Sequence, residues 1–123
     1  MISSKYRISK SYFPTILRNP SISGDYFRAV IAPSISKDLP HFATIISKKH
    51  AKLAVMRNLF RRTVYQVIHD QISQLPIKSI IFVMQKSIPY EKTALGRKNT
   101  TNKLSDDIKN ILDQVIKKYD KNK

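Results

Sequence analysis

The sequence predicts a single α+β domain, a two-layer sandwich in which helices pack on one side of a sheet of about four strands. The hydrophobic period changes several times along the 123 residues, and such changes are typical of helices and strands that share one core. A chain of this length can bury a sizeable core without covalent staples. It also contains no cysteine for disulfides or thiolate chemistry. We therefore expect one domain over residues 1–123.

The first predicted elements are a short helix and a strand. Pro14 fits only in the first turn of a helix, so a helix is expected to begin near Phe13. Residues 21–24 have the composition of a turn. Residues 26–32 alternate as a strand does. The alternation assigns one set of side chains to the core face: Phe27, Ala29 and Ile31.

Two further strands are predicted. Residues 33–40 begin and end with proline and predict a hairpin-type connection. Residues 42–46 are aromatic and β-branched enough to form the strand that follows it. Residues 77–85 form a nearly continuous apolar run bounded by prolines. A run without alternation indicates a strand buried on both faces, in the middle of the sheet.

A long amphipathic helix is predicted directly after residues 42–46, with its N-terminus near residues 49–52. At about 100° per residue, one set of apolar side chains forms a stripe that would face the sheet: Leu53, Met56, Phe60, Val64 and Val67. The opposite side is expected to be exposed and collects another set: Asn58, Arg61, Arg62, Tyr65 and His69. Arg57 lies at the edge of the stripe, where its stem can pack while its guanidinium reaches solvent.

The C-terminal part predicts a loop followed by a last helix. Residues 86–103 are polar and basic and predict a long mobile loop. Ser105 is then expected to cap a helix whose dipole favours the acids Asp106 and Asp107 in its first turn. This helix has one apolar face: Ile108, Ile111, Leu112, Val115 and Ile116. The lysine-rich residues 120–123 are expected to fray.

The charge of the chain predicts an anionic partner. The formal net charge is +15, and no acid occurs between Asp38 and Asp70. A folded domain with such a charge repels itself unless a polyanion neutralises it, so nucleic acid is the first partner expected and an anionic membrane surface the second. The longest apolar run, Ile80 to Met84, is too short to span a bilayer. No apolar segment of signal-peptide length stands at the N-terminus, and we expect a cytoplasmic protein.

One ordered basic motif narrows this prediction. It consists of two parts separated by seven residues: Ser47-Lys48-Lys49 and Arg57-Asn58-x-x-Arg61-Arg62. The motif resembles the signature of the bacterial ribonuclease P protein subunit, in which a strand ending in Ser-Lys-Lys leads into a helix beginning near Arg-Asn-x-x-Lys/Arg-Arg. The string from Ala54 to Asn58 matches that family closely. The chain is identified as a divergent member of the family.

The resemblance implies a fold and a function. The fold would be ribosomal protein S5 domain 2-like, with the element order α-β-β-β-α-β-α. The protein would be the accessory subunit of an endoribonuclease whose catalytic RNA, together with Mg²⁺ held mainly by that RNA, removes the 5′ leader of precursor tRNA. We expect a monomer in a 1:1 ribonucleoprotein, with precursor tRNA as the second RNA partner and no catalytic residue or metal ligand in the protein.

The resemblance also implies two sets of contact residues. The RNA-binding set consists of Lys48, Lys49, Lys52, Arg57, Asn58, Arg61 and Arg62. The cleft for the single-stranded leader would be lined by Phe13, Tyr26, Arg28 and Val30. Three positions depart from the family pattern. His50-Ala51 replaces a Gly-containing spacing, Leu17 stands where an aromatic is common, and Tyr65 replaces a further arginine.

Each assignment has an alternative. A cation cluster on a helix is often only a solvated face, Phe13 could be a packing residue, and Asn58 could brace the backbone. A metal-independent ribonuclease could use His50 or His69 with Lys49 as acid and base, although no helical or strand spacing brings two histidines together. The composition equally allows a ribosomal or other structural RNA-binding protein.

Overall fold

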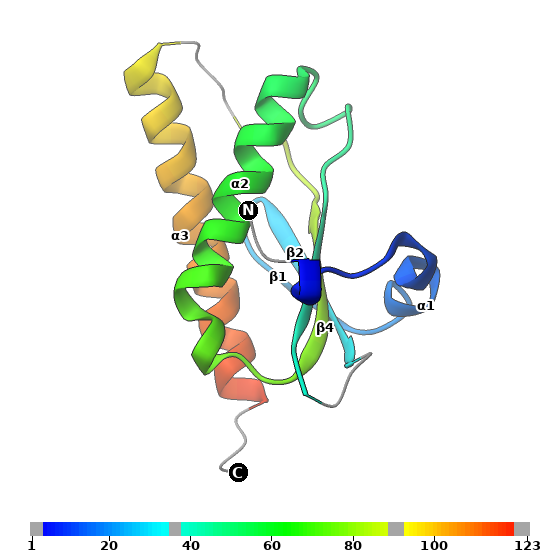
Figure 1. The fold of residues 1–123 in the computed structure, drawn as a ribbon. Helices are drawn as coiled ribbons and strands as arrows, with labels where there is room; N and C mark the ends of the chain where they lie inside the picture. Colours follow the sequence, from blue (N-terminus) through cyan, green and yellow to red (C-terminus); the bar gives the residue numbers. More distant parts are fainter. Residues whose placement is uncertain (1–3, 35–37, 89–92, 120–123) are drawn as a thin grey trace.

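The computed structural model describes residues 4–34, 38–88 and 93–119. Within them, four strands form one mixed sheet, with two long helices against one face and a short helix on the other side (Figure 1). The helices and strands, in chain order, are α1 (Phe13–Ile16), β1 (Ser21–Ser23), β2 (Phe27–Pro33), β3 (His41–Ile45), α2 (Ala54–Gln71), β4 (Lys78–Met84) and α3 (Ala94–Lys118). Short 3₁₀ turns cover Ser4–Tyr6, Lys10–Tyr12 and Ile72–Gln74. The α+β class and the predicted order of elements are confirmed.

The strand order is β1-β2-β4-β3. Strand β4 pairs antiparallel with β2 and parallel with β3. Its central position is confirmed, because Ile80, Ile81 and Phe82 are all fully buried. The hairpin-type connection predicted for residues 33–40 is wrong, since β4 lies between the two strands that this segment joins; residues 35–37 lie outside the described part. A strand that is apolar on both faces takes the centre, where both faces are covered.

The position of the first strand was not predicted, although the element order implied by the resemblance includes three strands before the long helix. Residues 21–24 were expected to form a turn, yet Ser21–Ser23 pairs antiparallel with β2 at the edge of the sheet. Two serines in a three-residue strand give no hydrophobic alternation, so the sequence carries little strand signal there. A short polar strand is a common way to end a sheet, because it offers little surface for unwanted pairing.

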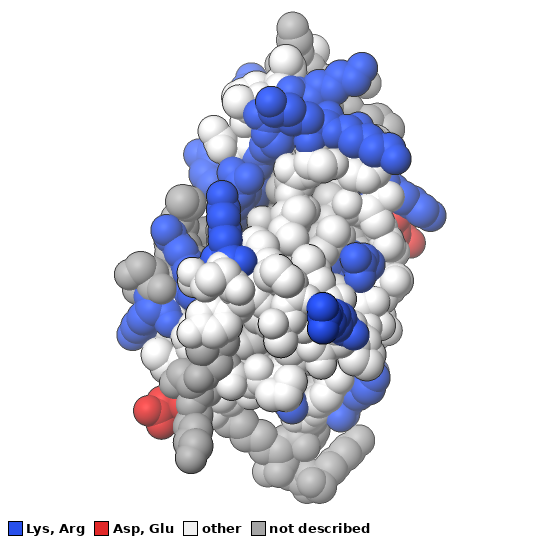
Figure 2. Space-filling model, turned by 90° about the vertical axis from the view of Figure 1, so that its right-hand side faces the viewer, with Lys and Arg blue, Asp and Glu red and all other residues white. Residues whose placement is uncertain are grey.

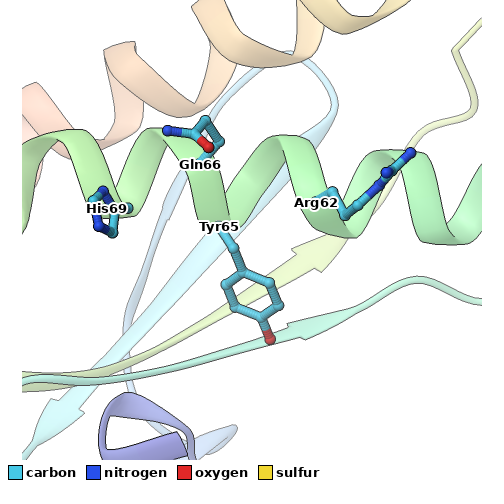
Figure 3. Close-up of a pocket in the computed structure, with 4 residues that line it drawn as sticks. All are labelled: Arg62, Tyr65, Gln66 and His69. Atoms are coloured by element: carbon cyan, nitrogen blue, oxygen red, sulfur yellow. The ribbon is translucent and has the colours of Figure 1, made fainter. Parts of the chain in front are cut away.

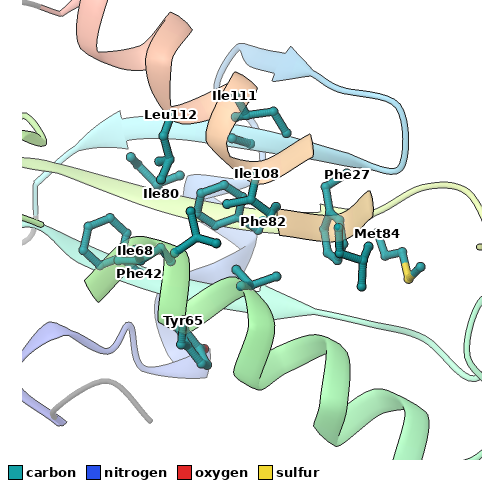
Figure 4. Close-up of a cluster of buried hydrophobic side chains, with 14 of the residues drawn as sticks. Phe27, Phe42, Tyr65, Ile68, Ile80, Phe82, Met84, Ile108, Ile111 and Leu112 are labelled. Atoms are coloured by element: carbon teal, nitrogen blue, oxygen red, sulfur yellow. The ribbon is translucent and has the colours of Figure 1, made fainter. Parts of the chain in front are cut away.

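The main core lies between the sheet and the two long helices. Phe27, Ala29 and Ile31 face this core, as the alternation of β2 predicted. Aromatic and aliphatic side chains from the sheet and both helices pack together there (Figure 4). A smaller cluster on the other face includes Val30 and Ile81, which pack with Ile16 of α1. Both faces of the sheet therefore contribute to stability, but α1 covers its face only in part.

Helix α3 begins much earlier than predicted. Thr93 caps it, with its hydroxyl accepting the Gly96 N–H at 3.0 Å. The prediction of a loop over residues 86–103 is therefore wrong from Thr93 onward, and so is the cap at Ser105; residues 89–92 lie outside the described part. Gly96, Thr100 and Leu104 are buried along one line of the helix. Their spacing of four is helical, but only Leu104 is a strong apolar signal.

Asp107 ties α3 to the turn between β1 and β2. Its carboxylate accepts the backbone N–H groups of Asp25 at 2.6 Å and of Tyr26 and Phe27, both at 3.0 Å. The side chain is only 4% exposed. A Cβ at Gly24 would overlap this carboxylate, so a glycine is needed there for close approach. The prediction that Asp107 lies in the first turn of a helix and interacts with its dipole is wrong. The residue lies inside α3, and its carboxylate binds backbone N–H groups at the start of β2.

We expect Asp107→Ala to destabilise the fold by about 3 kcal/mol, because it leaves three backbone donors without their charged acceptor. The free energy of unfolding, measured with urea, checks this. Asp106→Ala is the matched control, since Asp106 is the exposed neighbour on the same helix. Equal unfolding midpoints for the two variants would show that the carboxylate contributes nothing specific.

Candidate nucleic-acid interface

Exposed cations surround the start of α2. Lys48, Lys49 and Lys52 lie in the segment between β3 and α2, and all three are exposed. The helix was expected to begin near residues 49–52, but it begins at Ala54 with Leu53 as an N-cap that provides no side-chain hydrogen bond. The preceding segment instead folds into a turn in which the His50 and Ala51 N–H groups donate to the Ser47 carbonyl. The three lysines thus belong to a turn.

Arg57 holds this turn against the helix. Its Nη1 group donates to the carbonyl of Ala51 at 2.9 Å and to that of Lys52 at 3.0 Å. Ala51 is fully buried beneath the turn. Of the residues predicted to bind RNA, Arg57 is therefore the one whose guanidinium contacts the chain's own backbone. It positions the lysines around it.

The next turns of α2 present polar groups outward. Arg61 Nη1 donates to Asn58 Oδ1 at 3.3 Å, so Asn58 orients the guanidinium one turn further along. Together with Val55 and the exposed Arg62, these side chains line a shallow surface pocket. Guanidinium groups at such a pocket can bind phosphate oxygens in pairs. We use the name α2 basic surface for the exposed residues Lys48, Lys49, Lys52, Asn58 and Arg62 together with the half-buried Arg61.

Tyr65 does not belong to the exposed side of α2, contrary to the prediction. It is 8% exposed and packs in the main core. Figure 3 shows its ring directed away from Gln66 and toward the strands. Tyr65 lines a small pocket together with Arg62, Gln66 and His69. Burial of the large apolar ring stabilises the fold more than its exposure to solvent would. The run of guanidinium groups on α2 therefore ends at Arg62.

The charged and uncharged surfaces are separated. Figure 2 shows Lys and Arg atoms gathered over the end of the molecule where α2 begins, and a mostly uncharged area on the α1 side of the sheet. Local concentration of one sign of charge raises the local concentration of polyanions. The separation gives one surface suited to phosphates and another suited to bases.

The four residues predicted to line the leader cleft are not all on this uncharged face. Arg28 is half-buried on β2, and Phe13 is half-buried on α1 beside the smaller cluster. Val30 is fully buried, so it cannot line an open surface. Tyr26 precedes β2 and packs against the main core, on the other side of the sheet. The structure thus brings together only Phe13 and Arg28 of this set.

Two residues on the uncharged face were missed. Val83 lies opposite Arg28 on one side and opposite Ile45 on the other, so the three share a face of the sheet. Val83 and Ile45 are half-buried beside Phe13 and Leu17. Their positions follow from strand parity once the pairing is known, but the sequence does not give the register between non-consecutive strands.

Two other kinds of site were searched for. In the part of the chain that the structure describes, no three His, Asp or Glu side chains lie close enough together to hold a metal ion. The described helices include none that is both apolar and long enough to cross a membrane.

Comparison with known proteins identifies a family for the chain. The family model described as Ribonuclease P matches residues 3–116. None of the curated proteins matches the sequence.

Solved structures match the fold. The Staphylococcus aureus RNase P protein superposes with a TM-score of 0.72, covering 89% of this chain and 94% of that one at 21% identity. A mutant of the Staphylococcus aureus protein with defective mRNA degradation activity gives 0.73, covering 89% and 87% at 21% identity. The Thermotoga maritima RNase P protein gives 0.69, covering 89% and 96% at 16% identity. At these identities the likeness concerns the fold.

We expect Arg57→Lys to loosen the turn although it keeps the charge, because an ammonium cannot reproduce the geometry of the guanidinium. The loss of stability should be about 1 kcal/mol, with faster amide hydrogen exchange at His50 and Ala51. Arg62→Lys is the control, since Arg62 is exposed on the same helix. Unchanged exchange in the Arg57 variant would show that the two carbonyl contacts do not hold the turn.

Proposed function

The chain belongs to the ribonuclease P protein family, and we propose that it binds the catalytic RNA and the 5′ leader of precursor tRNA to assist Mg²⁺-dependent removal of the leader. The family match over residues 3–116 carries this proposal. The RNA would perform the phosphodiester hydrolysis and would hold most of the Mg²⁺. The protein would act in the cytoplasm as one subunit of a 1:1 ribonucleoprotein.

The α2 basic surface suits the catalytic RNA. Its lysines and arginines lie on a turn and a helix that are fixed to each other by Arg57, so little ordering entropy remains to be lost on binding. Phosphate contacts of this kind position an RNA without reading its sequence. The surface would therefore fix the protein on a folded RNA.

The uncharged face suits the leader. Phe13, Val83 and Ile45 offer apolar surface beside the cation of Arg28. Unpaired bases pack on such surfaces regardless of their identity, while a nearby cation contacts the backbone. A face of this chemistry would accept leaders of different sequence, as a general tRNA-processing enzyme requires.

A metal-independent ribonuclease is disfavoured by the positions of the histidines. His50 precedes α2 and His69 lies near its end, and the helix from Ala54 to His69 alone rises by about 22 Å. His41 shares the α1 side of the sheet with Ala43, whereas α2 packs on the opposite side. Acid–base catalysis needs both groups within hydrogen-bond reach of one substrate. A ribosomal or other structural RNA-binding role is the second candidate.

Cleavage of a leader-bearing precursor tRNA at low Mg²⁺ tests the proposal. The protein alone, a bacterial catalytic RNA alone and their mixture are compared, and correct 5′ cleavage is expected only from the mixture. Cleavage by the purified protein alone would instead support the histidine mechanism. Tight RNA binding without stimulation would support the structural RNA-binding role.

The double variant Arg61→Ala/Arg62→Ala should weaken RNA binding with little loss of stability, because both side chains extend from the outer side of α2. The slope of log K against log salt should become shallower by about 1.4, since each lost contact with single-stranded RNA is worth about 0.7. Filter binding at several salt concentrations measures both effects.

Lys109→Ala/Lys117→Ala is the matched control for this variant. It removes the same charge from exposed positions on α3. If the two double variants lose affinity equally, binding depends on net charge and the α2 basic surface has no special role.

A further inference from the structure

A cavity lies beside the turn that precedes α2. Its volume is about 430 Å³, which is within the size range of small-molecule sites. Two chain segments line it: the turn with the first residues of α2, and the segment that follows β4. We call it the turn pocket. It adjoins the α2 basic surface, whose residues Lys49 and Lys52 also belong to the lining of the pocket.

The wall of the turn pocket is apolar. Leu53 is 45% exposed, Met56 is half-buried, and Ile88 is buried behind them. Leu53 occupies the N-cap of α2, where Ser, Thr, Asp or Asn would stabilise the helix by a side-chain hydrogen bond. Leucine at this position gives up that bond and leaves apolar surface in water. Neither feature benefits the isolated protein, which indicates that the wall serves a ligand.

The rim of the pocket is cationic. Lys49 and Lys52 are exposed at its edge, and none of the lining residues within the described ranges 38–88 and 93–119 is acidic. Two ammonium groups beside an apolar wall match a ligand that carries an apolar, planar part next to a negative charge. An unpaired nucleotide has this composition, with a base attached to a phosphodiester backbone.

His50 joins the two segments that form the pocket. Its Nδ1 lies 3.3 Å from Ser87 Oγ, and both residues line the cavity. This contact holds the turn to the segment after β4. The pocket is therefore formed before a ligand arrives.

We propose that the turn pocket binds one unpaired RNA nucleotide, with its base against Leu53 and Met56 and its phosphates beside Lys49 and Lys52. The proposal rests on the RNA-binding function proposed above and names a site within it. It makes this turn a place where the protein recognises a base that is not stacked in a helix, whereas the arginines of α2 contact only the backbone.

The test uses the full chain and two single-stranded oligomers of about eight nucleotides, one with all its bases and one abasic throughout. Leu53→Ala should bind the base-bearing RNA about fivefold more weakly, because one base loses its contact surface. Its affinity for the abasic oligomer and its salt slope should match those of the original chain. Leu53→Phe, which enlarges the wall, should bind the base-bearing RNA more tightly.

Leu95→Ala is the matched control, because Leu95 is an exposed leucine near the start of α3. It should leave both affinities unchanged. The proposal is overturned if Leu53→Ala and Leu53→Phe bind both oligomers as the original chain does, or if they weaken both oligomers equally. Stimulation of precursor cleavage is measured separately on the same variants, so failure of the pocket and failure of the subunit role give different results.

Discussion

The burial of β4 on both faces determines where the functional surfaces can lie. Ile80, Ile81 and Phe82 are fully buried in the middle of the sheet, so each face needs a cover. The two long helices cover one face completely. Of the described residues, α1, a helix of four residues, and Ile8 pack on the other face, and they leave Val83 half-buried. An incomplete cover over an apolar strand leaves exposed the uncharged surface that we propose for the leader.

The same constraint explains why the cations lie on α2. A helix that packs one stripe against the sheet must expose its other side, and here that side carries Arg61 and Arg62. The lysines of the preceding turn extend the charge beyond the helix end. Because like charges repel, the turn needs contacts of its own, and Arg57 supplies them by bonding to two carbonyl groups. Arg57 thus uses two of its hydrogen bonds within the chain, and these bonds hold the three lysines close to one another.

The sequence predicted the features whose pattern lies within a few consecutive residues, and it missed those that depend on contacts between distant segments. Strand alternation in β2, the apolar run of β4 and the stripe of α2 are local patterns, and all three have structural counterparts. The register between β2 and β4 is not local, so Val83 was missed. The packing of Ile16 of α1 against Val30 is not local either, so Val30 was assigned to an open face. The first turns of α3 were missed because Thr100 and Gly96 are buried there without being strongly hydrophobic. The three backbone donors of Asp107 lie about eighty residues away from it in the chain.

Two of the three departures from the family pattern have a clear physical counterpart in the structure. His50-Ala51 stands where a Gly-containing spacing is usual, and there Ala51 is fully buried while His50 contacts Ser87. Tyr65 stands where a further arginine is usual, and it packs in the core. The tyrosine takes a cation away from the middle of α2, and His50 joins the two segments that line the turn pocket near the start of the helix. Under the proposed function, both departures place the RNA contacts of this chain toward the N-terminal end of α2, where Lys49 and Lys52 lie beside exposed apolar surface.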